Sequence, residues 1–294
     1  MRCQGFGRRI LDGSHVKVVI QKPDLDTCLT GLILGVKEDD AISTAFENAP
    51  VELLSDPKVF CIEAGGSGQV HLNNFDHHDP GLNLPAASRQ AYAAMRVCHE
   101  KLDRLVRYVE MIDGCAPRPP QREGLIGLSS IFSGMMHCIQ NMRAQFVEGI
   151  GMLNTVLEQD IDPFGNIPLI PQWKRYYVAW LKNRMHLAQV LKSIEIFDTN
   201  GGRRGGFLDN PGVGGLGCLY AKGCDIGILS CSSFGPGRVQ KYTIGSTGLN
   251  IGILILSLNT VEPGWGGRST IIGSPRRGSL LSPEFIIETV VKIF

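Results

Sequence analysis

The chain has 294 residues, of which 43% are hydrophobic and 19% are charged, and its formal net charge is +1. This composition is typical of globular proteins and argues against a disordered or fibrous chain. Because positive and negative charges nearly balance, no general basic field gathers long nucleic acids, and an anionic ligand needs a local site.

The sequence also argues against a membrane or secreted protein. No apolar run reaches the roughly 18 residues that a membrane-spanning helix needs. The nine cysteines are scattered and form no Cys-x-x-Cys pair, which is typical of reduced thiols and not of disulfides or a zinc site. We therefore expect a cytoplasmic protein that makes no membrane contact.

Strands alternate with helices in the first half of the chain. The β-branched run 16–20 and the run 59–62 are predicted strands, and a third strand is expected just before residues 73–74. Helices are predicted over 27–36 and, from apolar residues at helical spacing, over 102–112. This alternation predicts an α/β fold with a doubly wound, mostly parallel sheet.

The second half begins with a helical segment, 126–197, and then becomes rich in glycine. Short strands are expected there at 217–220, 226–231, 239–244 and 251–258. Ser282 and Pro283 are favoured residues for the start of a final helix. We predict two domains: residues 1–190 with the parallel sheet and a helical linker, and residues 191–294 as a smaller α/β domain.

Acidic residues follow three of the predicted strands. Asp24 and Asp26 follow the first, Glu63 follows the second and Asp76 follows the third. Ligands of parallel sheets bind at the carboxyl ends of the strands, so we expect these side chains at one edge of the sheet. Carboxylates combined with imidazoles suit Mn²⁺ or Mg²⁺.

Two histidines follow Asp76 directly. In an extended chain the side chains of His77 and His78 point in opposite directions, so one can bind a metal while the other faces a substrate phosphate. Two ions about 3.5–4 Å apart activate water and clamp a phosphoryl group. Taken singly, each acidic residue also fits a solvated turn or loop, and the histidines fit a partly buried pair or a surface pair. Their convergence on one edge favours a site.

The segments 18–26, 60–63 and 76–78, with Asp113 as a fourth candidate, carry a family resemblance. They resemble the motifs of the DHH phosphoesterase superfamily, which includes single-strand exonucleases, phosphodiesterases and type II inorganic pyrophosphatases. The segment 264–275 is similar to the Gly-rich substrate loop of the accessory domain of the DHHA1 type. The resemblance covers most of the chain and implies a DHH-like domain followed by that accessory domain.

The resemblance also implies roles for the acidic residues. Asp24 would bind one metal ion and Asp26 the other, and Glu63 would bridge them. His77 and Asp113 would complete the second site.

Catalytic roles and substrate contacts follow from the same resemblance. The implied catalytic residues are Asp76, which also counts among the metal ligands, His77 and His78, which would face phosphate. In the Gly-rich loop, backbone N–H groups would approach the anion while basic side chains add charge. The implied substrate-binding residues are His78, Gly266, Gly267, Arg268, Lys241 and Arg238.

Three positions depart from the family pattern. Ile20 stands where a histidine usually precedes the first aspartate, Glu63 replaces an aspartate, and Arg268 replaces a common histidine. Since isoleucine cannot bind a metal, the first metal site is expected to be weakened, lost or supplied by another ligand.

The function predicted from these residues is metal-dependent hydrolysis of phosphoesters by metal-activated water. We expect two Mn²⁺ or Mg²⁺ ions, with one ion as the alternative. The expected substrates are short single-stranded oligonucleotides or small nucleotide or phosphate compounds. The alternative function is a catalytically degenerate relative that binds a phosphate ligand, nucleotide or metal without turnover. A homodimer is left open.

Overall fold

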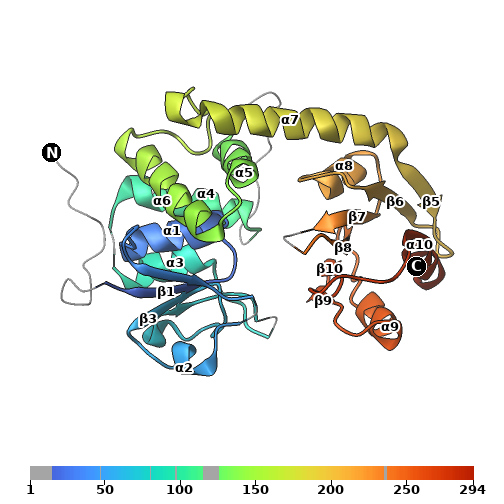
Figure 1. The fold of residues 1–294 in the computed structure, drawn as a ribbon, viewed down its shortest axis with the longest axis horizontal. Helices are drawn as coiled ribbons and strands as arrows, with labels where there is room; N and C mark the ends of the chain where they lie inside the picture. Colours follow the sequence, from blue (N-terminus) through green and yellow to red (C-terminus); the bar gives the residue numbers. More distant parts are fainter. Residues whose placement is uncertain (1–14, 47, 80, 97, 115–125, 235–236) are drawn as a thin grey trace. The chain divides into compact units, whose positions relative to one another are not determined.

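The structure is a computed structural model that describes residues 15–46, 48–79, 81–96, 98–114, 126–234 and 237–294. The chain divides into two compact units, Met1–Trp180 and Leu181–Phe294. Their boundary falls inside helix α7 (Lys174–Val190). Each unit has a sheet and a hydrophobic core of its own (Figure 1).

The described part of the N-terminal unit contains a four-stranded sheet with the order β2-β1-β3-β4. The strands are β1 (Lys17–Ile20), β2 (Ala41–Thr44), β3 (Val59–Ile62) and β4 (Asn74–Phe75). Every neighbouring pair is parallel. The predicted α/β fold with a parallel sheet is therefore confirmed, and β1 and β3 match their predicted runs. Strand β2 was not predicted, because it is a short and largely exposed edge strand without a strong apolar pattern.

Alternate residues of β1 enter two different cores. Val18 packs in the main core with apolar residues of α1 (Leu25–Leu34), whereas Val19 packs in a second core next to α2 (Val51–Leu54). Since successive strand residues point to opposite faces, both faces of this sheet are covered by helices (Figure 1). This is the doubly wound arrangement that the alternation of elements predicts.

Local sequence signals explain where α1 and α4 begin and end. The Asp24 carboxylate accepts a hydrogen bond from the Thr27 N–H at the start of α1, and Gly35 ends that helix with a φ of 73°. The amphipathic helix α4 (Glu100–Ile112) buries Leu102, Leu105, Val106 and Val109. The predicted helix over 102–112 is thus confirmed, and Gly114 follows it with a φ of 85°.

The remaining helices of the N-terminal unit surround this framework. They are α3 (Ala87–Ala94), α5 (Leu128–Cys138), α6 (Met142–Glu158) and the short 3-10 helices Val70–Leu72 and Pro171–Trp173. The expected helical character of the segment 126–197 is confirmed over α5, α6 and α7.

The C-terminal unit has a six-stranded sheet with the order β5-β6-β7-β8-β10-β9. The strands are β5 (Glu195–Asp198), β6 (Arg204–Asp209), β7 (Ile226–Phe234), β8 (Val239–Ser246), β9 (Gly266–Arg268) and β10 (Ile271–Gly273). Strands β6 and β7 run parallel, and the other neighbouring pairs are antiparallel. The predicted strands at 226–231 and 239–244 are confirmed as parts of β7 and β8.

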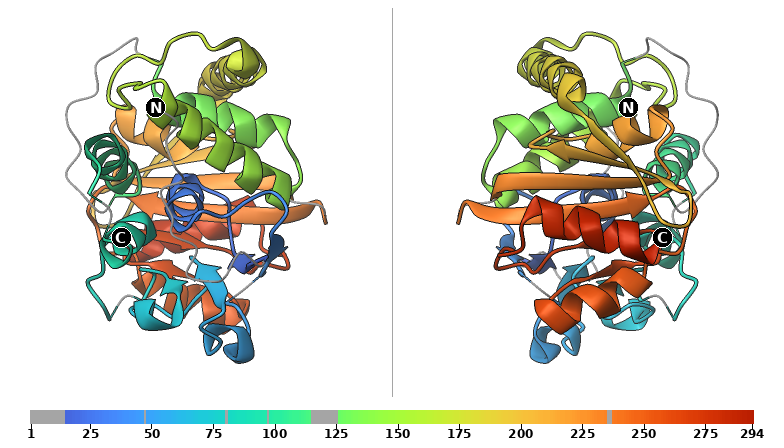
Figure 2. Two further views of the ribbon diagram at one scale, coloured as in Figure 1. Left: turned by 90° about the vertical axis from the view of Figure 1, so that its left-hand side faces the viewer. Right: turned by 90° about the vertical axis from the view of Figure 1, so that its right-hand side faces the viewer.

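Helices cover both faces of the second sheet. Helices α9 (Ile253–Val261) and α10 (Pro283–Ile293) pack on one face (Figure 2), and α8 (Gly215–Ala221) packs on the other, with the 3-10 helix Leu191–Ser193 nearby. Ser282 caps α10 by accepting a hydrogen bond from the Phe285 N–H, as its sequence predicts.

Two predicted strands of the second half are wrong. The run 217–220 lies in α8, and most of 251–258 lies in α9. Short apolar runs have no periodicity that separates a buried strand from a buried helix. In α9, Leu254 and Leu258 are buried one helical turn apart while Leu256 is exposed, a pattern that only a helix produces.

None of the described helices is both long and apolar enough to cross a membrane.

A close contact between α5 and α7 predicts that an alanine at Gly134 destabilises the N-terminal unit. A Cβ at Gly134 would lie 1.9 Å from the backbone oxygen of Tyr176, so the two helices must separate. We expect Gly134→Ala to lower the free energy of unfolding in urea by about 1–3 kcal/mol.

Gly151 in α6 is the matched control, since a Cβ there meets nothing within 4 Å. Gly151→Ala should raise stability by about 0.5–1 kcal/mol, because alanine has the higher helix propensity. Equal effects of the two substitutions would contradict the packing argument.

Candidate metal centre

The carboxyl ends of β1, β3 and β4 lie side by side at one edge of the first sheet. Ile20 pairs with Ile62, and Ile62 pairs with Phe75. The chain therefore leaves the three strands at the same level, and the segments that follow carry the acidic residues and the two histidines that the sequence singles out, except Asp113.

Asp26 lies in the first turn of α1 and is 1% exposed. Its Oδ2 accepts a hydrogen bond from the Ala87 N–H at 2.7 Å, and its Oδ1 accepts one from the Ser88 N–H at 2.9 Å, both at the start of α3. Burial raises the pKa of Asp26 to about 6; hydrogen bonds from Ser88 oppose the shift, and the charges of Asp113 and Asp24 add to it. The fold thus fixes this carboxylate where a nearby cation would stabilise its ionised form.

Glu63 follows β3 and adopts a left-handed φ of 49°. Its Oε2 accepts a hydrogen bond from the Thr27 hydroxyl at 2.7 Å. Its Oε1 is buried and accepts no hydrogen bond from the described residues, and it lies 3.7 Å from Nδ1 of both His77 and His78. Burial raises the pKa of Glu63 well above its usual range, and the charges of Asp24 and Asp26 raise it further.

His77 lies between the acidic residues, with a side chain that is 3% exposed. Its Nε2 is 3.1 Å from Oδ2 of Asp113, which directly follows α4, and its Nδ1 is 3.7 Å from Oδ2 of Asp26. Two groups of potential metal ligands result, Glu63 with His77 and His78, and Asp26 with His77 and Asp113. Within each group the ligand atoms all lie within 4.8 Å of one another.

Asp76 has a different environment from the other acidic residues. Its Oδ2 accepts a hydrogen bond from the Gly65 N–H at 2.9 Å, and its Oδ1 accepts bonds from the Ser67 hydroxyl at 2.5 Å and the His78 N–H at 2.7 Å. Burial alone would raise its pKa, but hydrogen bonds from His78, Ser67 and Gly65 outweigh burial and hold the pKa well below its usual range. Asp76 therefore ties the loop that carries the two histidines to the loop after β3.

Asp24 and Ile20 stand apart from the two ligand groups. Asp24 caps α1, and its Oδ2 lies 3.6 Å from Nζ of Lys22, although its charge still acts on Asp26 and Glu63. Ile20 is 0% exposed and belongs to the main hydrophobic core. The position at which the resembled sequence motif has a histidine thus carries a core side chain in this chain.

The donor set fits a divalent cation. Glu63 provides a buried oxygen that no described donor satisfies, and the carboxyl groups of Asp26 and Glu63 both have raised pKa values. Imidazole nitrogens beside carboxylate oxygens suit borderline and hard divalent ions, including Mn²⁺. A cation would balance the buried negative charge that the fold gathers here.

Comparisons with known proteins agree with this geometry at the level of the fold. The chain is similar in structure to a pGpG-specific phosphodiesterase from Vibrio cholerae, with a TM-score of 0.56, 14% identity, and coverage of 94% of this chain and 97% of the other. It is also similar to the DHH domain of a member of the s1p family of ribosomal proteins, with a TM-score of 0.53, 15% identity, and coverage of 88% and 82%. The chain has a DHH-type fold. No protein-family model and no curated protein sequence matches it.

The residues expected to bind substrate lie in the C-terminal unit, except His78. Gly266, Gly267 and Arg268 form the exposed strand β9, which pairs with β10. A Cβ at Gly267 would lie 2.3 Å from the backbone oxygen of Ile271, so the close pairing of this hairpin requires glycine. The Gly-rich segment is therefore a β-hairpin in which only Arg268 offers a charged side chain.

Lys241 lies in β8, and Arg238 directly precedes that strand. The Lys241 ammonium donates hydrogen bonds to the backbone oxygens of Ser274 at 2.5 Å and Pro275 at 2.8 Å, so it holds the chain that follows β10. Burial lowers the pKa of Lys241, and the charge of Arg276 lowers it further. Arg238 is exposed. Of these two cations, Arg238 is the one whose side chain faces solvent.

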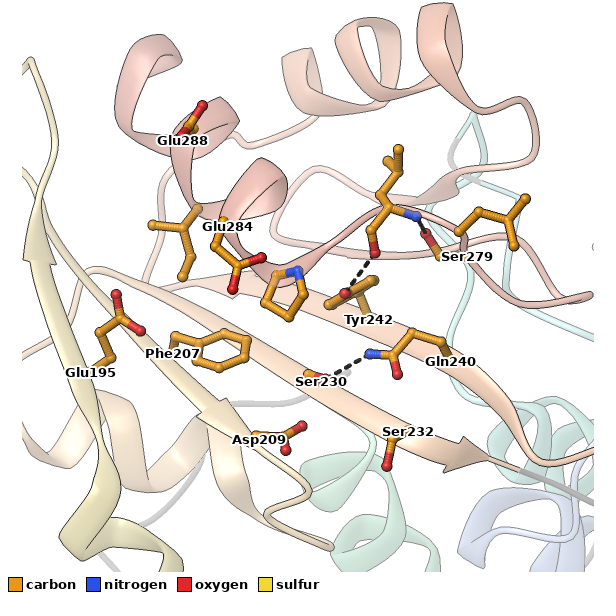
Figure 3. Close-up of a pocket in the computed structure, with 14 residues that line it drawn as sticks. Glu195, Phe207, Asp209, Ser230, Ser232, Gln240, Tyr242, Ser279, Glu284 and Glu288 are labelled. Carbon is orange, nitrogen blue, oxygen red and sulfur yellow. Dashed lines mark hydrogen bonds between the residues drawn. The ribbon is translucent and has the colours of Figure 1, made fainter.

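The C-terminal unit also contains a pocket of about 740 Å³ (Figure 3). Its lining includes four acidic residues and no lysine or arginine. The acidic lining residues are Glu195, Asp209, Glu284 and Glu288. Four carboxylates without a lysine or arginine in the lining disfavour a phosphate ligand, so this pocket is not a second site for the chemistry expected at the sheet edge.

Sequence reasoning missed the residues that support the site. Thr27, Ser67 and the N–H groups at the start of α3 all bond to the acidic side chains. Ser67 follows Gly65 and Gly66 in the segment after β3, and this pair of glycines indicates a turn. No local signal shows which carboxylate each of these donors meets.

The hydrogen bonds at Asp76 predict that Asp76→Asn destabilises the protein. Asparagine keeps one acceptor oxygen but turns an amide donor toward N–H or O–H donors. We expect the free energy of unfolding of the metal-free protein to fall by about 1.5–3 kcal/mol at pH 7. Because the folded pKa is depressed, this contribution is present above the unfolded pKa of about 4 and is lost as the pH falls below it.

Urea unfolding between pH 3 and pH 8 measures this difference. Asp79→Asn, which changes an exposed aspartate of the same loop, should change stability by no more than about 0.5 kcal/mol. A difference for Asp76→Asn that stays constant down to pH 3 would contradict the assignment.

The burial of Asp26 predicts an unusual titration in the metal-free protein. Its side-chain carboxyl carbon, followed by ¹³C NMR, should titrate with a midpoint at about 6. Because the folded pKa is raised, the stabilisation from protonated Asp26 is complete below the unfolded pKa of about 4 and is lost as the pH rises through 6. The urea-unfolded protein is the reference, in which the same carbon should titrate near 3.9. An unshifted midpoint in the folded protein would contradict the burial argument.

Proposed function

We propose that this protein is a metal-dependent phosphoester hydrolase. The observation that carries the proposal is the buried convergence of His77 with Asp26, Glu63 and Asp113 at the carboxyl edge of a parallel sheet. The similarity in fold to a pGpG-specific phosphodiesterase supports the same class of chemistry.

Mn²⁺ is the proposed ion, with Mg²⁺ as the alternative, because the ligands combine carboxylates with imidazole. When bound, such an ion supplies polarisation of a phosphoryl oxygen and activation of a water nucleophile. Asp26, Glu63, His77 and Asp113 would hold it, and Asp24 would contribute to a second ion where a pair is bound. The hydrogen bonds that Asp76 accepts from Gly65, Ser67 and the His78 N–H would keep His77 and His78 in place.

His78 is the proposed contact to phosphate. Its side chain is 51% exposed, and its ring stacks on that of His77 with the ring centroids 4.5 Å apart. A half-exposed imidazole beside the metal ligands can donate a hydrogen bond to a phosphoryl oxygen and still meet solvent. We propose that His78 binds and orients the substrate phosphate.

The proposed substrates are short single-stranded oligonucleotides or other small phosphoesters. The net charge is nearly neutral, and the sequence offers no long basic track for a long nucleic acid; the pGpG named for the structural neighbour is a dinucleotide.

We further propose that residues 1–190 form the metal-binding domain and that residues 191–294 bind substrate. The proposed contacts in residues 191–294 are Gly266, Gly267, Arg268 and Arg238, with Lys241 adding positive charge. The absence of paired cysteines favours a cytoplasmic location.

A degenerate binding protein is the alternative. The observation that favours it is the complete burial of Ile20 in the apolar core, since this side chain adds no ligand to the first metal position. Such a protein would keep a phosphate ligand or one ion without turnover.

Hydrolysis assays separate these functions. Chelator-treated protein would be incubated with linear dinucleotides and with a nitrophenyl phosphodiester, with and without added Mn²⁺. We expect turnover that requires Mn²⁺ and falls at least about 100-fold in His77→Ala, because an imidazole shared by both ligand groups is lost.

His71→Ala is the matched control, since His71 is exposed and outside both ligand groups, and it should leave turnover unchanged. Activity that survives in His77→Ala would refute the site. Metal binding without turnover on any substrate would favour the degenerate alternative.

A further inference from the structure

We propose that Thr27 is the positioning residue of the metal centre: its hydroxyl fixes Glu63 so that the second carboxylate oxygen faces His77 and His78. This inference rests on the proposed role of Glu63 as a metal ligand. Thr27 itself would touch neither the ion nor the substrate.

The two carboxylate oxygens of Glu63 have different roles because only one of them accepts the hydrogen bond from Thr27. Oε2 accepts from the Thr27 hydroxyl at 2.7 Å, and both side chains are buried. Oε1 accepts no hydrogen bond from the described residues and lies 3.7 Å from Nδ1 of each histidine. An ionised carboxylate can only accept, so with a cation bound the hydroxyl must be the donor. One oxygen is thereby anchored while the other stays available.

Thr27 is itself held rigidly. Its N–H donates to Oδ1 of Asp24 in the cap of α1, and the residue is 0% exposed. A β-branched side chain in a helix has few χ1 rotamers, which limits where the hydroxyl can point. The start of α1 thus sets the direction of the hydrogen bond to the loop after β3.

Glu63 needs such an anchor more than an aspartate would. Its side chain has one more rotatable bond, and it belongs to a loop residue with a φ of 49°. Free rotation of that bond would have to be lost when a metal binds, which weakens binding. A buried hydrogen bond that is already formed in the metal-free protein removes much of this cost.

The matched variants are Thr27→Val, Thr27→Ser and Thr30→Val. Valine has nearly the shape of threonine without the hydroxyl, and serine keeps the hydroxyl without the methyl group. Thr30 is also 0% exposed in α1, but its hydroxyl donates to the backbone oxygen of Asp26 at 2.8 Å. Thr30→Val therefore reports the loss of a buried hydroxyl from the same helix without a change at the Glu63 carboxylate.

The measurement is Mn²⁺ binding to the full-length chain, by isothermal titration calorimetry and by the electron paramagnetic resonance of free Mn²⁺. We expect Thr27→Val to weaken binding about 10–100-fold, as for other groups that orient a metal ligand. Thr27→Ser should bind within about threefold of the wild type, and so should Thr30→Val.

Thermal unfolding of each metal-free variant shows whether it is folded. If Thr27→Val does not fold, Thr27→Ala, which also lacks the hydroxyl, takes its place. Equal weakening of Mn²⁺ binding by Thr27→Ala and Thr30→Val would then overturn the proposal. Unchanged Mn²⁺ affinity in a folded Thr27→Val would also overturn it. If the wild type binds no Mn²⁺, the proposed function itself fails, which is a distinct result.

Discussion

The parallel pairing of β1, β3 and β4 is the constraint on which the rest of the site depends. Ile20, Ile62 and Phe75 are neighbours across the sheet, so the following loops start at one level. Acidic residues far apart in the sequence therefore share one small volume. The apolar residues of both sheet faces stabilise this pairing, because each face is buried against helices.

Burying several carboxylates together is unfavourable, and the fold offsets the cost in two ways. Asp76 receives hydrogen bonds from three donors and stays ionised. Asp26 and Glu63 receive fewer donors relative to their burial, and their pKa values are raised. The difference in pKa indicates different roles: Asp76 holds its loop in place, whereas a cation would stabilise the ionised forms of Asp26 and Glu63. It also distinguishes this edge of the sheet from an exposed cluster of acidic residues.

Much of the first sheet was predictable, because its signals are local. β1, β3, α1 and α4 each have a β-branched run, a cap or an apolar helical pattern of their own. The second unit was harder, since α8 and α9 are short apolar segments whose helical state depends on the sheet against which they pack. Strand β2 was missed because pairing with β1, and not its own composition, makes it a strand.

The sequence by itself determined which residues bring the chemistry: the run Asp76-His77-His78 and acidic residues placed directly after strands. Only the tertiary structure decided where each side chain is buried and which hydrogen bonds it makes. It places Ile20 in the core, commits both oxygens of Asp76, and joins Thr27 to Glu63 across 36 positions. The physical reason is that partners of buried polar groups are set by strand register and helix packing, which bring together segments that the sequence keeps apart.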